Sequence, residues 1–209
     1  MATNEEKQTW RSRVGWLAGQ MFVIFLGVSA AFFVESYRET LSEKAELRQA
    51  IAGLVTELGH YEQRSPQLAD GFKAENERWA AEDRAGRRAV PGHFRIPGAP
   101  YPPSAAWNTA VAAGILRLLD PKLRMELGYH YSEFLGIHEN YNRYHQFTER
   151  EILPRLAEGP DAFYGPDGKL LPIFRVHMDL ENDFAADLRR LAGEAHDLRV
   201  RLEALRDSR

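Results

Sequence analysis

The chain contains no cysteine among its 209 residues. Disulfides, thiolate zinc sites, iron–sulfur clusters and a lipid-modified N-terminal cysteine are therefore excluded. Catalytic fingerprints are also lacking, since no G-x-S-x-G, H-E-x-x-H, P-loop or dinucleotide-binding motif occurs in the sequence. The sequence thus predicts no catalytic residue, indicates no cofactor, and favours a protein that is not an enzyme.

An excess of charge of one sign is missing as well. The chain has 27 basic and 30 acidic side chains and a formal net charge of -3. Proteins that bind nucleic acid usually carry a strongly basic surface, because they neutralise phosphates. We therefore expect no nucleic acid among the partners of this protein.

Charge is absent altogether from one stretch near the N-terminus. Residues 14–34, VGWLAGQMFVIFLGVSAAFFV, include no charged side chain. A helix of this length extends about 31 Å, close to the thickness of the hydrocarbon core of a bilayer. Trp16 and Tyr37 lie near its two ends, where interfacial aromatic residues are common. We predict a transmembrane helix over 14–34, a short leader over 1–13 and an extramembrane domain over 35–209.

A cleaved signal peptide is the alternative interpretation of this stretch. Val28-Ser29-Ala30 offers small residues of the kind that signal peptidase requires. The apolar run continues beyond this point to Val34, which favours a retained span in the lipid bilayer.

The orientation of the span is predicted from its flanking basic residues. Their numbers are equal on the two sides: Lys7, Arg11 and Arg13 before the span, and Arg38, Lys44 and Arg48 after it. The close pair of arginines and the short leader favour an N-terminus in the cytoplasm. The bulk of the chain would then lie in the periplasm, anchored in a bacterial inner membrane.

Small residues recur along one side of the predicted span. Gly15, Gly19, Gly27 and Ala31 are separated by multiples of four residues, and Gln20 lies beside them. Such a ribbon lets another helix approach closely, and a buried amide seeks a hydrogen-bond partner. We predict helix packing against other membrane protein subunits here; chance is the alternative, because glycine and alanine are common in membrane helices.

Helical periodicity continues beyond the span. Apolar residues follow alternating steps of three and four: Leu47, Ile51, Leu54, Leu58, Tyr61, Leu68, Phe72 and Trp79. Pro66 interrupts this pattern, and we expect a kink or a new helix start there with Ser65 as the N-cap.

The segment 86–104, GRRAVPGHFRIPGAPYPPS, is rich in proline and glycine and predicts a long loop. We expect an ordered strap across the helices; the alternative is a docking loop for a partner, using its arginines together with Phe94 and Tyr101.

A second helix is predicted to start at Ser104. Asp120-Pro121 predicts the N-cap and first turn of a third helix, which extends to about Leu153.

The final helix, predicted over 178–206, has a coiled-coil-like seam: Phe184, Leu188, Leu191, Ala195, Leu198, Leu202 and Leu205. We expect this seam to pack against the similar seam of the first extramembrane helix. The predicted fold is therefore all-α, with one N-terminal transmembrane helix that continues into an antiparallel bundle of four or five helices.

The third helix holds most of the candidate functional side chains. His130, His138 and His145 lie among four tyrosines, and His138 and His145 share one face. Metal ligands on a helix are usually three or four residues apart, whereas these are separated by seven or eight. We therefore predict a hydrogen-bonded inner layer and no metal site, with His138 and His145 as weak candidates for a metal or a pH-responsive role.

Two stretches, FVIFLGVSAAFFVESYRE and AWNTAVAAGILRLLDPKLRMELGYHYSEF, resemble a family of uncharacterised bacterial single-pass membrane proteins. The matching positions are Gly27, Glu35, Tyr37, Trp107, Gly114, Leu116, Leu119 and Tyr131. The resemblance implies a membrane-anchored helical domain with an extracytoplasmic location. It implies no activity and no catalytic residue.

These features favour a non-catalytic, single-span accessory or structural subunit of a larger bacterial membrane complex, such as a photosynthetic or respiratory assembly. Docking would use the span and the bundle, and a homo-oligomer is compatible with this arrangement. The alternative is a membrane-tethered ligand or pH sensor that uses the His/Tyr-rich helix.

Overall fold

The computed structural model describes residues 5–93 and 104–207, with side chains described from Gln20 onward except at 22–24. The elements are the helices α1 (Glu5–Arg84), α2 (Ala105–Ala112), α3 (Pro121–Phe147), α4 (Leu153–Leu156) and α5 (Pro172–Asp207), the 3-10 turns η1 (Ile115–Leu118) and η3 (Pro160–Phe163), and the π-helical turn η2 (Thr148–Ile152). No strand occurs in these ranges beyond a single bridge between Tyr164 and Leu170. The prediction of an all-α fold is confirmed.

The chain divides into two compact units, residues 1–47 and 48–209. The first unit contains the N-terminal part of α1, whose large apolar side chains are exposed wherever they are described between Met21 and Leu41. In the part of the chain that the structure describes, no helix offers an apolar stretch sufficient to cross a membrane. Residues 14–19 and 22–24 of the predicted span lie outside the residues whose side chains are described.

In the second unit, α5 packs antiparallel to α1. Asp70 pairs with Arg189 at 2.6 Å, and the earlier Glu62 pairs with the later Arg199 at 2.7 Å. Earlier residues of α1 therefore meet later residues of α5. This confirms the expectation that the C-terminal seam packs against the first extramembrane helix.

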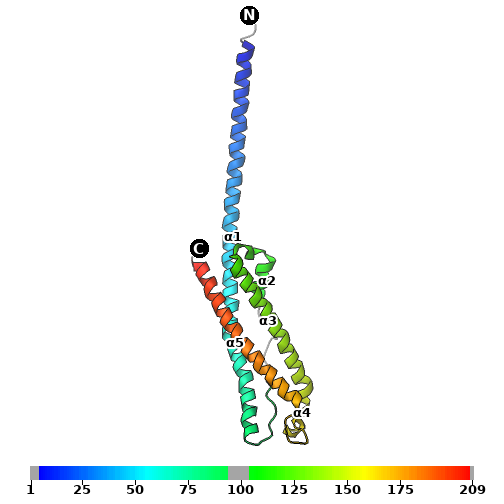
Figure 1. Cartoon of the computed structure of the whole chain (residues 1–209). Helices are drawn as coiled ribbons and strands as arrows, with labels where there is room; N and C mark the ends of the chain where they lie inside the picture. The colour runs from blue at the N-terminus through cyan, green and yellow to red at the C-terminus, as the bar shows by residue number, and fades with distance from the viewer. Residues whose placement is uncertain (1–4, 94–103, 208–209) are drawn as a thin grey trace. The chain divides into compact units, whose positions relative to one another are not determined.

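Helix α3 is antiparallel to α5 but parallel to α1 (Figure 1). Tyr61 of α1 contacts the ring of Tyr131, whereas the later Phe72 shares a core cluster with the later Tyr141. The antiparallel bundle was therefore predicted only in part. A segment as long as 86–104 can extend to about 60 Å, and α3 is about 40 Å long. The connection after α1 is therefore long enough to bring the chain back to the start of a helix that runs parallel to α1.

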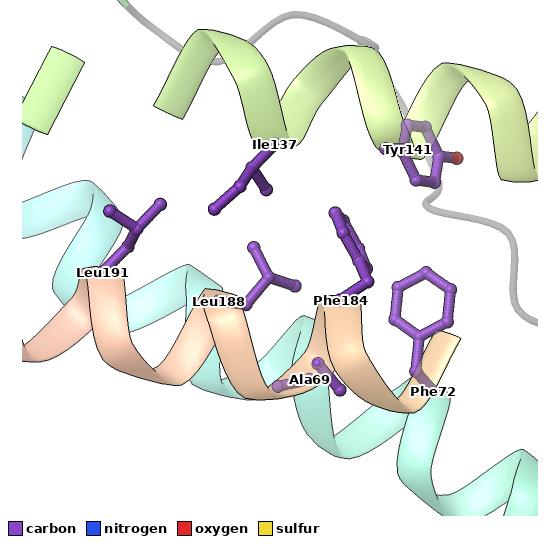
Figure 2. Packing of buried hydrophobic residues seen from close by; sticks show 8 residues of the cluster. Ala69, Phe72, Ile137, Tyr141, Phe184, Leu188 and Leu191 are labelled. Carbon is purple, nitrogen blue, oxygen red and sulfur yellow. The ribbon is translucent and has the colours of Figure 1, made fainter. Parts of the chain in front are cut away.

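The central core is built by the three long helices (Figure 2). Phe184 of α5 points between α1 and α3, and its ring meets those of Phe72, Tyr141 and Tyr144. Ala69 lies beside it on α1, where its small side chain leaves room for the larger rings. The mixture of small and aromatic residues lets the three helices interdigitate.

Of the two outcomes expected at Pro66, a kink or a new helix start, the new start does not occur. Helix α1 continues through Pro66, and Ser65 is a buried interior residue instead of an N-cap. An interior proline costs about 3 kcal/mol, because it cannot donate a backbone hydrogen bond. Tyr61 and Phe72 are buried on either side, and each contributes about 1.5–3 kcal/mol of burial free energy. Packing of the two flanks therefore outweighs the lost hydrogen bond.

Helices α2 and α3 contact each other through the stacked rings of Trp107 and Tyr131. Helix α2 ends at Ala112 because Gly114 adopts a left-handed conformation with φ 64°, after which η1 turns the chain. As predicted, Asp120 caps α3: its carboxylate accepts hydrogen bonds from the backbone N–H groups of Lys122 and Leu123. The predicted end near Leu153 falls within the continuation of α3 through η2 and α4.

The described part of the Pro/Gly-rich segment, residues 86–93, packs on the bundle. The Tyr164 hydroxyl accepts a hydrogen bond from the backbone of Ala89 and donates one to its carbonyl, while Trp79 Nε1 donates to the same hydroxyl. Arg88 pairs with Asp161 at 2.8 Å. These contacts agree with an ordered strap for residues 86–93; Phe94, Arg95 and Tyr101 lie outside the described residues.

Replacing Phe184 with alanine should destabilise the bundle by about 3–5 kcal/mol, because it removes a buried ring and leaves a cavity. Val176→Ala on the exposed side of the same helix should change the free energy of unfolding by less than about 0.5 kcal/mol. Urea unfolding followed by circular dichroism measures both. Equal effects of the two substitutions would contradict the assigned core.

Candidate functional site

The buried polar side chains of the bundle concentrate on and around α3. His130, Tyr131, His138 and Tyr141 of this helix are buried, whereas Tyr129 is exposed. Their positions follow from helical periodicity, since the buried residues share the face that carries Leu123 and Leu127. A buried layer of histidine and tyrosine therefore lines α3 as predicted, but within the described residues the predicted hydrogen bonds are not made by the ring nitrogens of His130 or the hydroxyl of Tyr131.

Glu57 of α1 joins α1 to α2. Its carboxylate accepts hydrogen bonds from the backbone N–H groups of Ala106 at 2.9 Å and Trp107 at 3.4 Å, the first turn of α2. The side chain is buried. Because the first N–H groups of a helix have no partner within that helix, a carboxylate placed there satisfies them and interacts favourably with the helix dipole. Glu57 thus supplies α2 with the cap that Ser104 does not provide through its side chain.

Aromatic rings surround this carboxylate. Trp107 stacks on Tyr131 with 4.7 Å between ring centroids and 10° between planes. Burial raises the pKa of Tyr131 well above its ordinary value, and the negative charge of Glu57 raises it further. Burial also raises the pKa of Tyr61, and the Glu57 charge adds to this effect. Both phenols therefore stay protonated throughout the physiological pH range.

His130 is buried among rings. Its Nδ1 lies 3.7 Å from the carboxylate of Glu194, and neither ring nitrogen makes a hydrogen bond to the described residues. Tyr61 and Phe134 face the imidazole. Burial lowers the pKa of His130, and the negative charges of Glu194 and Glu133 oppose this shift. The neutral imidazole is therefore the form that the folded bundle favours.

The weak metal candidates His138 and His145 have different environments. His138 is buried beside Asn142, whose Nδ2 is 3.2 Å from its Nε2, and burial lowers the pKa of His138. His145 is partly exposed, and its Nε2 lies 3.8 Å from Glu149. Within residues 5–93 and 104–207, no group of three or more His, Asp or Glu side chains could hold a metal ion.

Sequence reasoning missed a buried pair on α5. His177 Nε2 lies 3.2 Å from Glu181 Oε1, and the two side chains are 3% and 1% exposed. Phe147 stacks on the imidazole at 4.3 Å. The signal was present, because stepping back from Phe184 by three and then four residues extends the core seam to Glu181 and His177. The pair occupies two seam positions that are usually apolar.

A further buried amide, that of Asn76, connects the C-terminal part of α1 to α5. Asn76 Nδ2 donates to the carbonyl of Met178 and to the side chain of Asn182, both at 3.1 Å. Gly92 of the strap passes so close that a Cβ there would meet Asn76 Oδ1 at 2.0 Å. Only glycine allows this approach of the strap to α1.

The predicted helix-packing residues belong to the first unit. Gly15 and Gly19 lie outside the residues whose side chains are described, whereas Gln20 and Ala31 are exposed. A Cβ added to Gly27 would meet no atom within 4 Å. The described part of the ribbon is therefore open.

Comparisons of the chain with protein-family models, with curated proteins and with solved structures found no match.

Removing the Glu57 carboxylate by Glu57→Ala should cost about 1–3 kcal/mol, because two backbone donors lose their acceptor. Glu57→Gln retains one acceptor oxygen and should cost less. The sharpest readout is hydrogen exchange, which should accelerate at the amides of Ala106 and Trp107. Glu77→Ala, on an exposed part of α1, is the control; faster exchange in this variant would argue against the assigned cap.

The stability of the bundle should fall as the pH drops below about 6.5, the ordinary histidine pKa. Because the folded pKa values of His130 and His138 are lowered, the unfolded chain takes up protons first, and the loss continues until the folded pKa is passed. His130→Phe should reduce this slope, whereas His60→Phe, at an exposed position, should not. Urea midpoints between pH 5 and 8 provide the test.

Proposed function

We propose that this protein is a non-catalytic accessory or structural subunit that a single helix anchors in a bacterial inner membrane, as part of a larger protein complex. The observation that carries the proposal is the set of large exposed apolar side chains on α1: Met21, Phe25, Leu26, Val28, Phe32, Phe33, Val34, Tyr37 and Leu41. At 100° per residue these side chains cover about two thirds of the helix circumference, and the remaining sector holds the smaller Gly27 and Ala31 together with Gln20. A helix that is apolar all round is usually surrounded by lipid or by other protein.

The interior of the bundle supports a structural role. Glu57 binds the backbone of α2, Asn76 binds α5, and the Tyr164 hydroxyl binds the strap. Each of these three groups joins one part of the chain to another. Such groups give a bundle a single register and a defined surface, which a bracing subunit needs.

The sequence supports the placement of the subunit. A span over 14–34, with an N-terminus in the cytoplasm and residues 35–209 in the periplasm, fits the pattern of its flanking residues. The ribbon of Gly15, Gly19, Gly27 and Ala31 would dock on helices of the host complex. Energy-converting assemblies, photosynthetic or respiratory, are suitable hosts.

The alternative is a membrane-tethered ligand or pH sensor. His130, buried without a hydrogen bond to the described residues, favours this more than His138 or His145, because protonating a buried imidazole strains its surroundings. A sensor would have to transmit that change to a partner. Co-extraction of partners that is constant from pH 5 to 8, and identical in His130→Phe, would reject this alternative.

The leading proposal predicts that the native protein remains in membranes after a carbonate wash and is extracted in mild detergent together with a stoichiometric partner. Gly27→Leu should weaken co-extraction by about tenfold while the chain stays in the membrane, since bulk on the ribbon prevents close helix approach. Phe25→Leu, on the opposite side of the helix, is the matched control. A chain found in the wash, or a free monomer after extraction, would refute the proposal.

A further inference from the structure

One side of α3 faces away from the bundle and is apolar. We define the α3 outer face as Met125, Gly128, Tyr129, Ser132, Leu135 and Gly136. Met125, Tyr129 and Leu135 are 56%, 65% and 54% exposed. The six residues span about 120° of the helix, centred opposite the buried Leu123 and Tyr141.

The α3 outer face combines projecting side chains with hollows. A Cβ added to Gly136 would meet no atom within 4 Å, and one added to Gly128 would meet only Trp107, at 3.9 Å. Tyr129 and Leu135 project beside these glycines. A glycine inside a helix costs about 1 kcal/mol relative to alanine, and nothing in contact with Gly136 offsets that cost within the described chain.

The face matches a copy of itself. Two α3 helices placed antiparallel about Ser132 bring together residues whose distances from Ser132 differ by no more than one residue, about 1.5 Å along the axis, when their angular offsets are similar. Tyr129 of one copy then lies over Gly136 of the other. Leu135 likewise lies over Gly128, so each projecting side chain meets a hollow.

The charges at the ends of the face match in the same arrangement. Arg124 and Glu139 are both exposed. They lie eight residues before and seven residues after Ser132, on one side of the helix. In the antiparallel pair, Arg124 of each copy therefore faces Glu139 of the other. A parallel pair would instead place like residues together.

We propose that the α3 outer face binds the same face of a second copy of this chain, in a two-fold, antiparallel dimer. The contact is one helix pair, which places it at the small end of specific interfaces, so the dimer is reversible. It goes beyond the role of the protein as an accessory subunit and does not depend on the membrane anchor.

Cysteine crosslinking of the full chain in mild detergent tests the geometry, and the absence of native cysteine gives each variant a single thiol. Ser132→Cys should form a disulfide-linked dimer on oxidation, because this position lies on the two-fold axis within disulfide reach. Val200→Cys, exposed on α5, should remain monomeric. A Ser132→Cys variant that does not link, or links no faster than the control, would overturn the proposal.

Sedimentation equilibrium in the same detergent tests the energetics. Gly136→Leu should weaken the dimer at least about tenfold, or by about 1.4 kcal/mol, while the monomer stays folded because the site is open. Arg124→Glu and Glu139→Arg should each weaken dimerisation by several fold, and the double variant should restore it. A dimer unaffected by Gly136→Leu is held by another surface, and a chain that stays monomeric leaves this face to another partner; either result overturns the proposal.

Discussion

The packing of α5 into the space between α1 and α3 is the constraint on which the bundle depends. Helices α1 and α3 are parallel, so a short hairpin cannot connect them. The apolar faces of both helices are therefore buried against α5. Phe184 touches rings from each. The seam of α5 also explains why the chain tolerates Pro66: the flanking turns of α1 are held by side chains of α5 and α3 and do not depend on one backbone hydrogen bond.

The buried polar groups add a fixed register to this apolar packing. Leucine and phenylalanine alone would permit sliding of one helix past another, since apolar contacts are not directional. Glu57 and Asn76 remove that freedom, because each has partners at a single register. Glu57 also holds α2 on the bundle, and the Tyr164 hydroxyl holds the strap. Burying these polar groups costs desolvation free energy. In return, their hydrogen bonds fix how the helices, α2 and the strap are arranged.

Local signals were enough to predict much of this fold. The seam from Phe184 to Leu202 and the Asp120 cap are confirmed, because periodicity and capping depend on neighbouring residues. The continuity at Pro66 and the parallel α3 could not be predicted in this way, since they depend on packing between distant segments. The same holds for the cap of α2, because Glu57 is 49 residues away in sequence from Ala106, whose backbone N–H donates to it. The His177–Glu181 pair obeys the same local periodicity, because it continues the seam from Phe184 toward the N-terminus of α5.

The apolar residues left outside the core are of two kinds, and they require different surroundings. Isolated exposed apolar side chains are normal on any protein surface. Those of α1 from Met21 to Leu41 are neither isolated nor confined to one side, so a single helix in one groove could cover only part of them, whereas lipid covers every side. The α3 outer face occupies one side of one helix and alternates projections with hollows. One complementary helix is enough to cover such a surface, and α3 of a second copy of the chain has the matching shape and charge.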